Sequence, residues 1–184
     1  MRLFTGIDLP DEIKERLDVL ITHLRNTAHL KWSPAYNLHI TTKFIGEWPP
    51  ERLDELIARL AAIECKNKID ISVEELGWFP NPHHPRVFWA GVKASPSLAE
   101  LARATDEALA ELGVAPEARP YAPHLTLARI KEAVPLSALQ RAISALKSTD
   151  FGRFTAPAFY LYLSRRGAGG AVYTKLREFP LPTA

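Results

Sequence analysis

Two short segments of the chain each carry a histidine and a threonine separated by one residue. His39 and Thr41 lie in "NLHITTKFIGE", and His124 and Thr126 lie in "APHLTLARIKE". Apolar residues surround both pairs, which is typical of buried strands. Because side chains alternate across a strand, the members of each pair should point to the same face, about 7 Å apart.

Two such pairs facing one another would suit a phosphate ester. The hydroxyl groups can donate to non-bridging oxygens, a neutral imidazole can accept a proton from water, and a protonated imidazole can donate one to a departing alkoxide. A single His-x-Thr pair is usually structural, but buried polar groups cost stability unless they are paired. Two copies in matched contexts therefore favour one shared site.

A shift of 85 residues aligns the two segments and much of the chain around them. The same shift places a helical segment at 11–27 on 97–112 and a strand at 2–9 on 87–94, and it pairs Tyr36, His39, Thr41, Ile45, Glu47 and Pro50 with Tyr121, His124, Thr126, Ile130, Glu132 and Pro135. We therefore predict a duplicated β-α-β-α-β unit.

The predicted fold is α+β and bilobal, with mainly antiparallel sheets lining a central cleft and helices outside. One domain spans 1–184, with halves at about 1–85 and 86–170 and a closing strand at 171–178. Periodicity predicts helices at 11–27, 51–63, 97–112 (capped by Ser97) and 136–147, and strands at 2–9, 37–46, 69–79, 86–93, 123–130, 156–164 and 171–178. Leu38, Ile40, Phe44 and Ile45 are the predicted core of the first motif strand.

The composition indicates a soluble globular protein. Of 184 residues, 47% are hydrophobic and 24% charged, and the net charge of +2 permits a polyanionic ligand without requiring one. The single cysteine, Cys65, excludes an internal disulfide. The N-terminus lacks the apolar stretch of a signal peptide, and no apolar run is long enough to cross a bilayer. We expect a cytoplasmic monomer without an obligate protein partner.

The chain resembles the 2H phosphoesterases, and within them the RNA 2′,3′-cyclic phosphodiesterases once called 2′-5′ RNA ligases. The resemblance extends over essentially the whole chain, through "RLFTGIDLP", "KWSPAYNLHITTKFIGE", "FPNPHHPRVFWAGV", "YAPHLTLARI" and "LYLSRRGAGGAVYTKL". One residue departs from the family pattern, because Thr42 stands where the family usually has leucine. Strand alternation should turn Thr42 away from the cleft, so we expect altered packing and intact chemistry.

The resemblance implies hydrolysis of a terminal 2′,3′-cyclic phosphate of RNA to a 2′-phosphomonoester, with no metal and no other cofactor. It implies that His39 is the proton donor, that His124 is the proton acceptor, and that Thr41 and Thr126 hold the phosphoryl oxygens. The residues alone leave the two histidine roles interchangeable. The reverse reaction would give a weak 2′-5′ RNA ligase activity.

Arg129 resembles a family arginine that lies near the phosphate. Strict alternation from His124 would place it on the opposite face of the strand, away from the cleft. Only a β-bulge or the strand end would bring the guanidinium to the substrate. A plain surface arginine is the alternative interpretation.

The terminal hairpin supplies the remaining candidates for substrate binding. Ser164 and Tyr173 lie on its two strands, and Arg165 and Arg166 lie at its turn. These residues could bind the RNA backbone and stack a base, although charges at a hairpin turn are more often simply solvated. Among the tryptophans, Trp78 is the best candidate for contact with a nucleobase.

Two other functions remain open at this point. The chain could be an RNA-end or nucleotide-binding module whose catalysis is vestigial, or a phosphodiesterase for small cyclic nucleotides. The intact motif pairs argue against the first alternative. Only a comparison of substrates separates the second alternative from an RNA enzyme, because nothing in the sequence reads a base edge.

Overall fold

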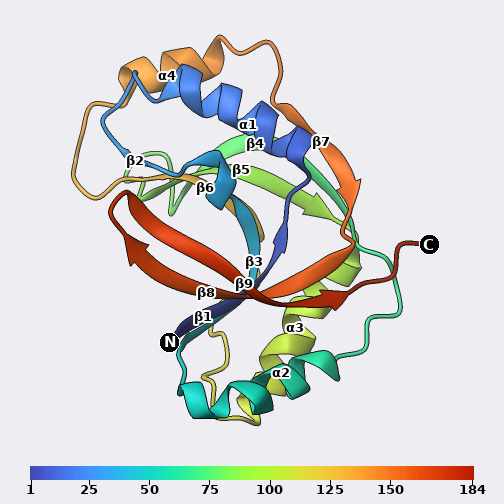
Figure 1. Ribbon diagram of the computed structural model, residues 1–184. Helices are drawn as coiled ribbons and strands as arrows, with labels where there is room; N and C mark the ends of the chain where they lie inside the picture. Colours follow the sequence, from blue (N-terminus) through green and yellow to red (C-terminus); the bar gives the residue numbers. More distant parts are fainter.

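The computed structural model describes residues 1–184 and contains two antiparallel sheets with helices on their outer sides (Figure 1). The first sheet, called sheet A, has four strands in the order β3-β1-β8-β9. Its strands are β1 (Arg2–Asp8), β3 (His39–Glu47), β8 (Ala158–Gly167) and β9 (Gly170–Pro180). The predicted closing strand is therefore β9, which forms one edge of this sheet.

The second sheet, called sheet B, has five strands in the order β2-β6-β5-β4-β7. They are β2 (Lys31–Trp32), β4 (Asp70–Phe79), β5 (Val87–Ala94), β6 (His124–Arg129) and β7 (Asp150–Thr155). Every pair in both sheets is antiparallel. The two motif strands thus belong to different sheets, β3 to sheet A and β6 to sheet B.

Four α-helices cover the outer sides of the sheets. Helices α1 (Asp11–Leu24) and α4 (Ser137–Ser144) pack together over sheet B, and α2 (Leu53–Ala61) and α3 (Pro96–Ala110) pack together against sheet A (Figure 1). Short 3₁₀ turns precede β3 and α2. The predicted α+β class, with antiparallel sheets and outer helices, is confirmed. No helix is both long and apolar enough to span a membrane.

Neither sheet is built from one half of the sequence. Strands β8 and β9 come from the second half and complete sheet A beside β1 and β3, while β4 comes from the first half and joins β5 and β6. Helix α1 directly follows β1 of sheet A but packs on β7 of sheet B. The predicted boundary near residue 85 therefore does not separate the two lobes, because each lobe needs strands from both halves.

The predicted elements are present with shifts of up to three residues at their ends, and three further differences have physical reasons. Ser97 lies inside α3 instead of capping it, because the helix begins at Pro96 and the Ser97 hydroxyl donates to the Lys68 carbonyl at 2.7 Å. Strand β2 was not predicted, because a strand of two residues is too short to show alternation. Strand β7 was not predicted either, because Gly152, with a φ of 122°, interrupts the strand pattern.

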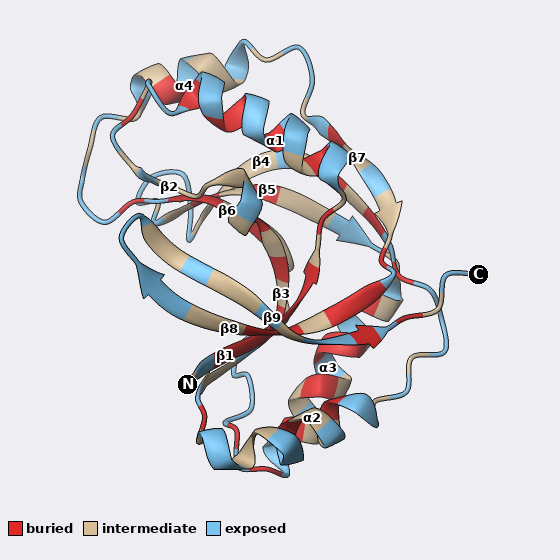
Figure 2. Cartoon of the chain, in the orientation of Figure 1, coloured by how far each residue is buried: buried red, intermediate tan, exposed pale blue.

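One continuous hydrophobic core runs through both lobes. Figure 2 shows buried residues on the strands and on the sides of the helices that face them. Ile40 of sheet A and Leu125 of sheet B are both fully buried, while the motif residues on either side of each remain partly exposed. The predicted alternation therefore holds within both motifs.

Thr42 occupies a buried position on the outer face of sheet A, as strand alternation predicts. Its side chain is 5% exposed, and its hydroxyl shares a 2.7 Å hydrogen bond with the hydroxyl of the fully buried Thr5. The residues 85 positions later are Ala90 and Leu127, which are both 0% exposed. Sheet A thus has a hydrogen bond between two threonine hydroxyls at the position where sheet B has two apolar side chains.

Replacing one member of this pair should destabilise the fold. We expect Thr42→Val to lower the free energy of unfolding by about 1–3 kcal/mol, because the Thr5 hydroxyl would stay buried without a partner. The double variant Thr5→Ala/Thr42→Leu, which copies sheet B, should recover most of that loss. Chemical denaturation measures both values. A double variant that is less stable than the single one would contradict this account.

Candidate active site

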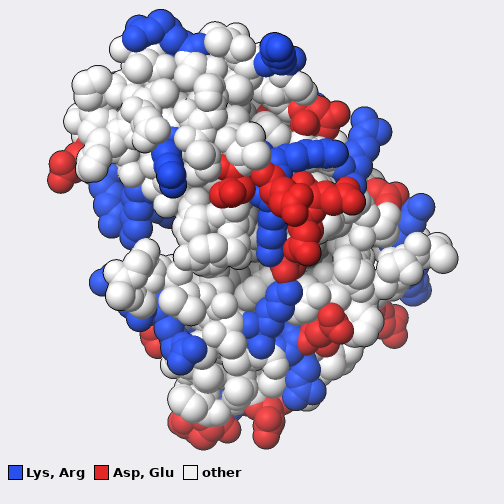
Figure 3. Space-filling view, turned by 45° about the horizontal axis from the view of Figure 1, so that its top comes forward, with Lys and Arg blue, Asp and Glu red and all other residues white.

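The two His-x-Thr pairs lie on strands that approach each other between the lobes. His39 and Thr41 are on β3, His124 and Thr126 are on β6, and all four side chains are partly exposed. Strands β3 and β6 are in contact. The surface is hollowed between the two lobes (Figure 3). The structure therefore brings the two predicted pairs to one region.

Both imidazoles are oriented by the same local hydrogen bond. Nδ1 of His39 lies 2.7 Å from the Asn37 carbonyl, and Nδ1 of His124 lies 2.8 Å from the Ala122 carbonyl. A carbonyl only accepts, so Nδ1 carries the proton in both rings. This leaves Nε2 of each ring as the atom that can exchange a proton with a substrate. In His39, Nε2 is 3.0 Å from the Thr41 hydroxyl oxygen.

A hydrogen bond joins the two motif segments directly. The Tyr121 hydroxyl, from the segment that leads into β6, donates to the Thr41 carbonyl of β3 at 2.8 Å. Burial raises the pKa of Tyr121, so its phenol stays protonated and keeps donating. Tyr36, which precedes the first motif by the same spacing, is 76% exposed and makes no such bond. The contact fixes the β6 motif relative to the β3 motif from one side only.

Each motif strand contains a β-bulge directly after its threonine. The register against the neighbouring strand skips Thr42 in β3 and Leu127 in β6, so two consecutive residues are buried in each strand. The bulge reverses the alternation beyond it. Phe44 and Arg129, the next residues, therefore return to the face that carries the motifs. The bulge that a cleft-facing Arg129 requires is present.

The same bulge overturns one prediction about the core. Alternation predicts that Phe44 is buried with the rest of its strand, but its side chain is 62% exposed. Periodicity along the strand therefore could not reveal this exposure. The only signal in the sequence is the shift of 85 residues, which pairs Phe44 with Arg129.

Aromatic side chains from sheet A surround the His39 ring. The Phe4 ring lies 4.7 Å from it, and Tyr173 approaches its edge at 5.1 Å. Tyr162 stacks on Phe4 at 4.8 Å. The predicted Tyr173 is thus adjacent to a motif histidine, and the predicted Ser164 is its cross-strand neighbour on β8. Sequence reasoning missed Phe4 and Tyr162, because each lies in an apolar strand that is typical of core.

On sheet B, Phe79 takes the position beside the histidine. Its ring lies 5.0 Å from that of His124, nearly perpendicular to it. Trp78 packs against the fully buried Phe88 at 4.6 Å and is itself partly exposed, so its contact with a base stays a prediction. Because side chains alternate, the residue after Trp78 faces the motif side.

Two glycines keep space free next to the motifs. A β-carbon on Gly6 would lie 2.9 Å from the Ile40 carbonyl oxygen, and one on Gly91 would lie 2.4 Å from the Glu74 carbonyl oxygen. Each glycine pairs with a motif residue on the neighbouring strand, Gly6 with Thr41 and Gly91 with His124. Any larger residue would displace the strands that position the site.

Burial and nearby charges determine the protonation of His39. Burial lowers its pKa, and the hydrogen bond to the Asn37 carbonyl and the negative charge of Asp8 raise it. The positive charges of His124 and Lys14 lower it further. Asp8 is the cross-strand partner of His39 on β1. Its carboxylate is held between the ammonium groups of Lys14 at 2.8 Å and Lys175 at 2.6 Å. The net pKa of His39 is below its ordinary value.

A charge of the opposite sign acts on His124. Burial lowers its pKa, the hydrogen bond to the Ala122 carbonyl raises it, and the positive charge of Arg129 lowers it further. The two imidazoles therefore share a geometry but differ in one nearby charge: a carboxylate acts on His39, and a guanidinium acts on His124. Taken alone, the carboxylate favours the protonated form of His39 and the guanidinium favours the neutral form of His124, while burial lowers the pKa of both.

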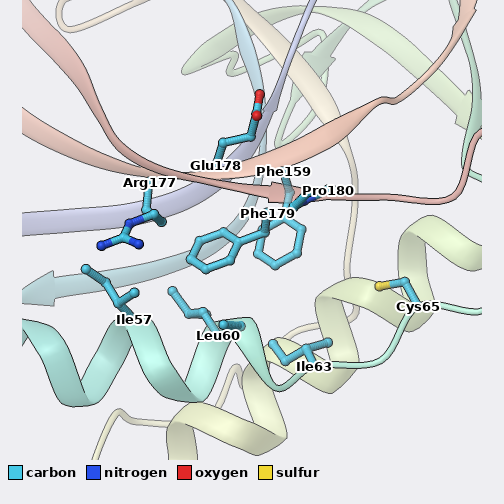
Figure 4. A pocket seen from close by; sticks show the side chains of 10 residues that line it. Ile57, Leu60, Ile63, Cys65, Phe159, Arg177, Glu178, Phe179 and Pro180 are labelled. Carbon is cyan, nitrogen blue, oxygen red and sulfur yellow. The ribbon is translucent and has the colours of Figure 1, made fainter.

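A separate pocket of about 370 Å³ lies on the outer face of sheet A, between α2 and β9 (Figure 4). Ile57, Leu60 and Ile63 line one wall and face Phe159 and Phe179. None of the four motif residues lines this pocket. It is a gap in the packing between helix and sheet and is separate from the motif site.

Comparison with known proteins agrees with this geometry. The model of the family described as "LigT like Phosphoesterase" matches residues 7–89 and 92–173. The chain belongs to this LigT-like phosphoesterase family. The resemblance to 2H phosphoesterases predicted from the sequence is thereby confirmed. The two matched segments begin 85 residues apart, which is the shift that aligns the two motifs.

Several curated relatives of the chain have similar length. A protein of Methanocaldococcus jannaschii named RNA 2′,3′-cyclic phosphodiesterase is 36% identical over 179 residues, covering 97% of this chain and 100% of the relative. A protein of the same name from Thermus thermophilus is 35% identical over 190 residues, covering 98% of this chain and 90% of the relative.

Solved structures of this family share the fold. The crystal structure of TT0787 of Thermus thermophilus has a TM-score of 0.80 and 31% identity, covering 98% of both chains. The crystal structure of E. coli LigT complexed with 3′-AMP has a TM-score of 0.79 and 26% identity, covering 99% of this chain and 98% of that one.

The opposite charges beside the two histidines can be tested by NMR titration of their imidazole resonances. We expect Asp8→Asn to lower the pKa of His39, since it removes the carboxylate and leaves the two lysines unbalanced. Arg129→Gln should raise the pKa of His124, since it removes a positive charge. Each substitution should shift mainly its own histidine. Equal shifts of both histidines in either variant would contradict the assignment of these local charges.

Proposed function

We propose that this protein hydrolyses the terminal 2′,3′-cyclic phosphate of RNA to a 2′-phosphomonoester. The observation that carries the proposal is the pair of imidazoles whose Nδ1 atoms bind backbone carbonyls, which leaves Nε2 of His39, beside Thr41, and Nε2 of His124 to exchange protons with a substrate. Membership of the phosphoesterase family and the names of the curated relatives support it. We further propose that the protein acts as a cytoplasmic monomer.

Hydrolysis requires two proton transfers on opposite sides of the phosphorus atom. His124 Nε2 takes a proton from water, and the water oxygen forms a new bond to phosphorus. The bond from phosphorus to the ribose 3′ oxygen breaks, and His39 Nε2–H protonates that oxygen. The product has a 2′-phosphate and a 3′-hydroxyl. One proton has left His39 and one has reached His124, so exchange with solvent restores the starting state.

The charges beside the two histidines support this assignment of acid and base. The proton donor must begin protonated, and the nearby carboxylate of Asp8 favours that form of His39. The proton acceptor must begin neutral, and the guanidinium of Arg129 favours the neutral form of His124. The sequence alone leaves the roles interchangeable. The carboxylate beside His39 and the guanidinium beside His124 agree in sign with the assignment that the family resemblance implies.

The threonines and Arg129 would hold the phosphate. The Thr41 hydroxyl lies 3.0 Å from Nε2 of His39 and would donate its proton to a phosphoryl oxygen. Thr126 would act in the same way on the other side, and the guanidinium of Arg129 would offset the negative charge on the phosphoryl oxygens. Tyr173 and Ser164 would contact the terminal nucleoside from the hairpin.

The same geometry would support a weak 2′-5′ RNA ligase activity. When a 5′-hydroxyl replaces water as the attacking group on the cyclic phosphate, the 3′ oxygen still leaves, so His124 remains the base and His39 the acid. When a 5′-hydroxyl attacks a 2′-phosphate in the place of the 3′ oxygen, water leaves and the two histidines exchange their roles. We propose ligation only as a minor reaction, because water at its bulk concentration competes with the 5′-hydroxyl group.

An RNA-end or nucleotide-binding module without catalysis is the alternative. Structural relatives favour a nucleotide site of some kind, since E. coli LigT has been crystallised with 3′-AMP, with NADP+ and with ATP. The two functions differ in turnover: a binding module would hold a cyclic-phosphate end and leave it intact.

Turnover can be measured with a short RNA that ends in a 2′,3′-cyclic phosphate, in excess EDTA. We expect a 2′-phosphate product in the presence of the chelator. His39→Ala and His124→Ala should each lower kcat by about 10²–10⁴-fold, because each removes one proton transfer. The product is identified by its sensitivity to phosphatases.

Three results would contradict the proposed chemistry. These are a 3′-phosphate product, turnover that needs a divalent metal, and full activity after both histidine substitutions. Binding of the RNA with no turnover by the wild-type protein would support the binding module. A matched control is His23→Ala, which alters a histidine in the last turn of α1, away from both motif strands, and should leave the rate unchanged.

A further inference from the structure

The cations at the two ends of the motif site differ in whether they form ion pairs. At one end lie Arg2, Lys31, Arg129 and Arg166, all exposed, and none of them forms an ion pair. Exposed cations without partners are free to bind an anionic ligand. We call this set the open cation end.

Strand register places these cations on the faces that carry the motifs. On sheet A, Arg2 pairs with Ser164, and Arg166 follows Ser164 by two residues on β8, so both share the face of Ser164. On sheet B, Lys31 pairs directly with Arg129 across β2 and β6. Both sheets therefore contribute cations to the same end of the site.

At the other end of the site three lysines are already paired, while the exposed Arg153 on β7 forms no ion pair. Lys14 and Lys175 bind Asp8 on the sheet A side. Lys93 on β5 binds Glu74 at 2.8 Å and Glu75 at 3.1 Å on the sheet B side. These carboxylates neutralise the lysines and would repel a second phosphate. In Figure 3, basic side chains stand above and below the hollow on its left, and acidic and basic side chains are interleaved to its right.

An exposed aromatic side chain accompanies the open cation end. The Phe44 side chain is 62% exposed. Phe44 follows the bulge in β3 and pairs with Phe4 of β1, two residues after Arg2, which pairs with Ser164. Proteins that bind single-stranded RNA combine a positive groove with aromatic rings on which bases stack. Both components are present at this end. The paired end has no exposed large hydrophobic side chain among its residues.

A cyclic-phosphate end has only one covalent continuation, through its 5′ oxygen, so the upstream RNA must leave the site in a single direction. We propose that it leaves over the open cation end, where Arg2, Lys31 and Arg166 contact backbone phosphates. This proposal rests on the proposed function and extends it, because it makes an RNA strand, and not a mononucleotide, the preferred substrate. The paired end would disfavour the opposite path.

The test compares a 2′,3′-cyclic mononucleotide with a ten-nucleotide RNA that ends in a 2′,3′-cyclic phosphate. Lys31→Gln/Arg166→Gln should lower kcat/KM for the ten-nucleotide RNA by about tenfold near 0.1 M salt, because two phosphate contacts are lost. The slope of log(kcat/KM) against log[salt] should become shallower by about 1.4, at roughly 0.7 for each contact with a single strand. The rate on the mononucleotide should stay the same.

A control variant that loses the same net charge elsewhere distinguishes the loss of local RNA contacts from a general effect of net charge. Arg103→Gln/Arg141→Gln removes two exposed arginines from α3 and α4, on the outer sides of the molecule. It should leave both substrates unaffected. Equal losses in the two double variants, equal losses on the two substrates, or no loss at all would overturn the proposal.

Hydrolysis of the mononucleotide tests the proposed function separately from the proposed path of the RNA strand. Wild-type protein that hydrolyses neither substrate would refute the proposed function. RNA binding at the open cation end would then be tested by fluorescence anisotropy with a ten-nucleotide RNA that carries a 2′-phosphate. Weaker binding by Lys31→Gln/Arg166→Gln alone would support the surface, and unchanged binding would refute it.

Discussion

The site depends on the alternation of side chains along two strands and on the one-residue interruption of that alternation in each. Within the motifs, alternation turns a histidine and a threonine to one face and buries the residue between them. The bulges at Thr42 and Leu127 then bury a second consecutive residue and return Phe44 and Arg129 to that face. Without the bulges, Arg129 would point into the core of sheet B.

The exchange of strands between the two halves of the chain gives this arrangement its rigidity. Sheet A contains β8 and β9 from the second half of the chain, and sheet B contains β4 from the first half, so each lobe is built from both halves. A single core continues through both. The hydrogen bond from Tyr121 to the Thr41 carbonyl adds a direct link at the site itself. Catalytic groups on such rigid elements keep their separation, which proton transfer over a short distance requires.

A nearly symmetric frame carries an asymmetric distribution of charge. The two imidazoles have equivalent hydrogen bonds to carbonyls two residues before them, and equivalent glycines lie beside them. The charges nearby are not equivalent, since Asp8 acts on His39 and Arg129 acts on His124. Identical environments would give two histidines with the same pKa, whereas an acid and a base need different ones.

The sequence by itself determined the fold class, the helices and the four motif residues. Those features depend on local periodicity and on a repeated pattern, both of which are present in the order of the residues. The tertiary structure decided which strands pair, where the bulges fall and which charges approach each histidine. Phe44 looked like core and is exposed, and Arg129 looked misplaced and faces the site, because a bulge is fixed by packing against the neighbouring strand. Asp8 looked like the end of a strand, and only cross-strand pairing places it beside His39.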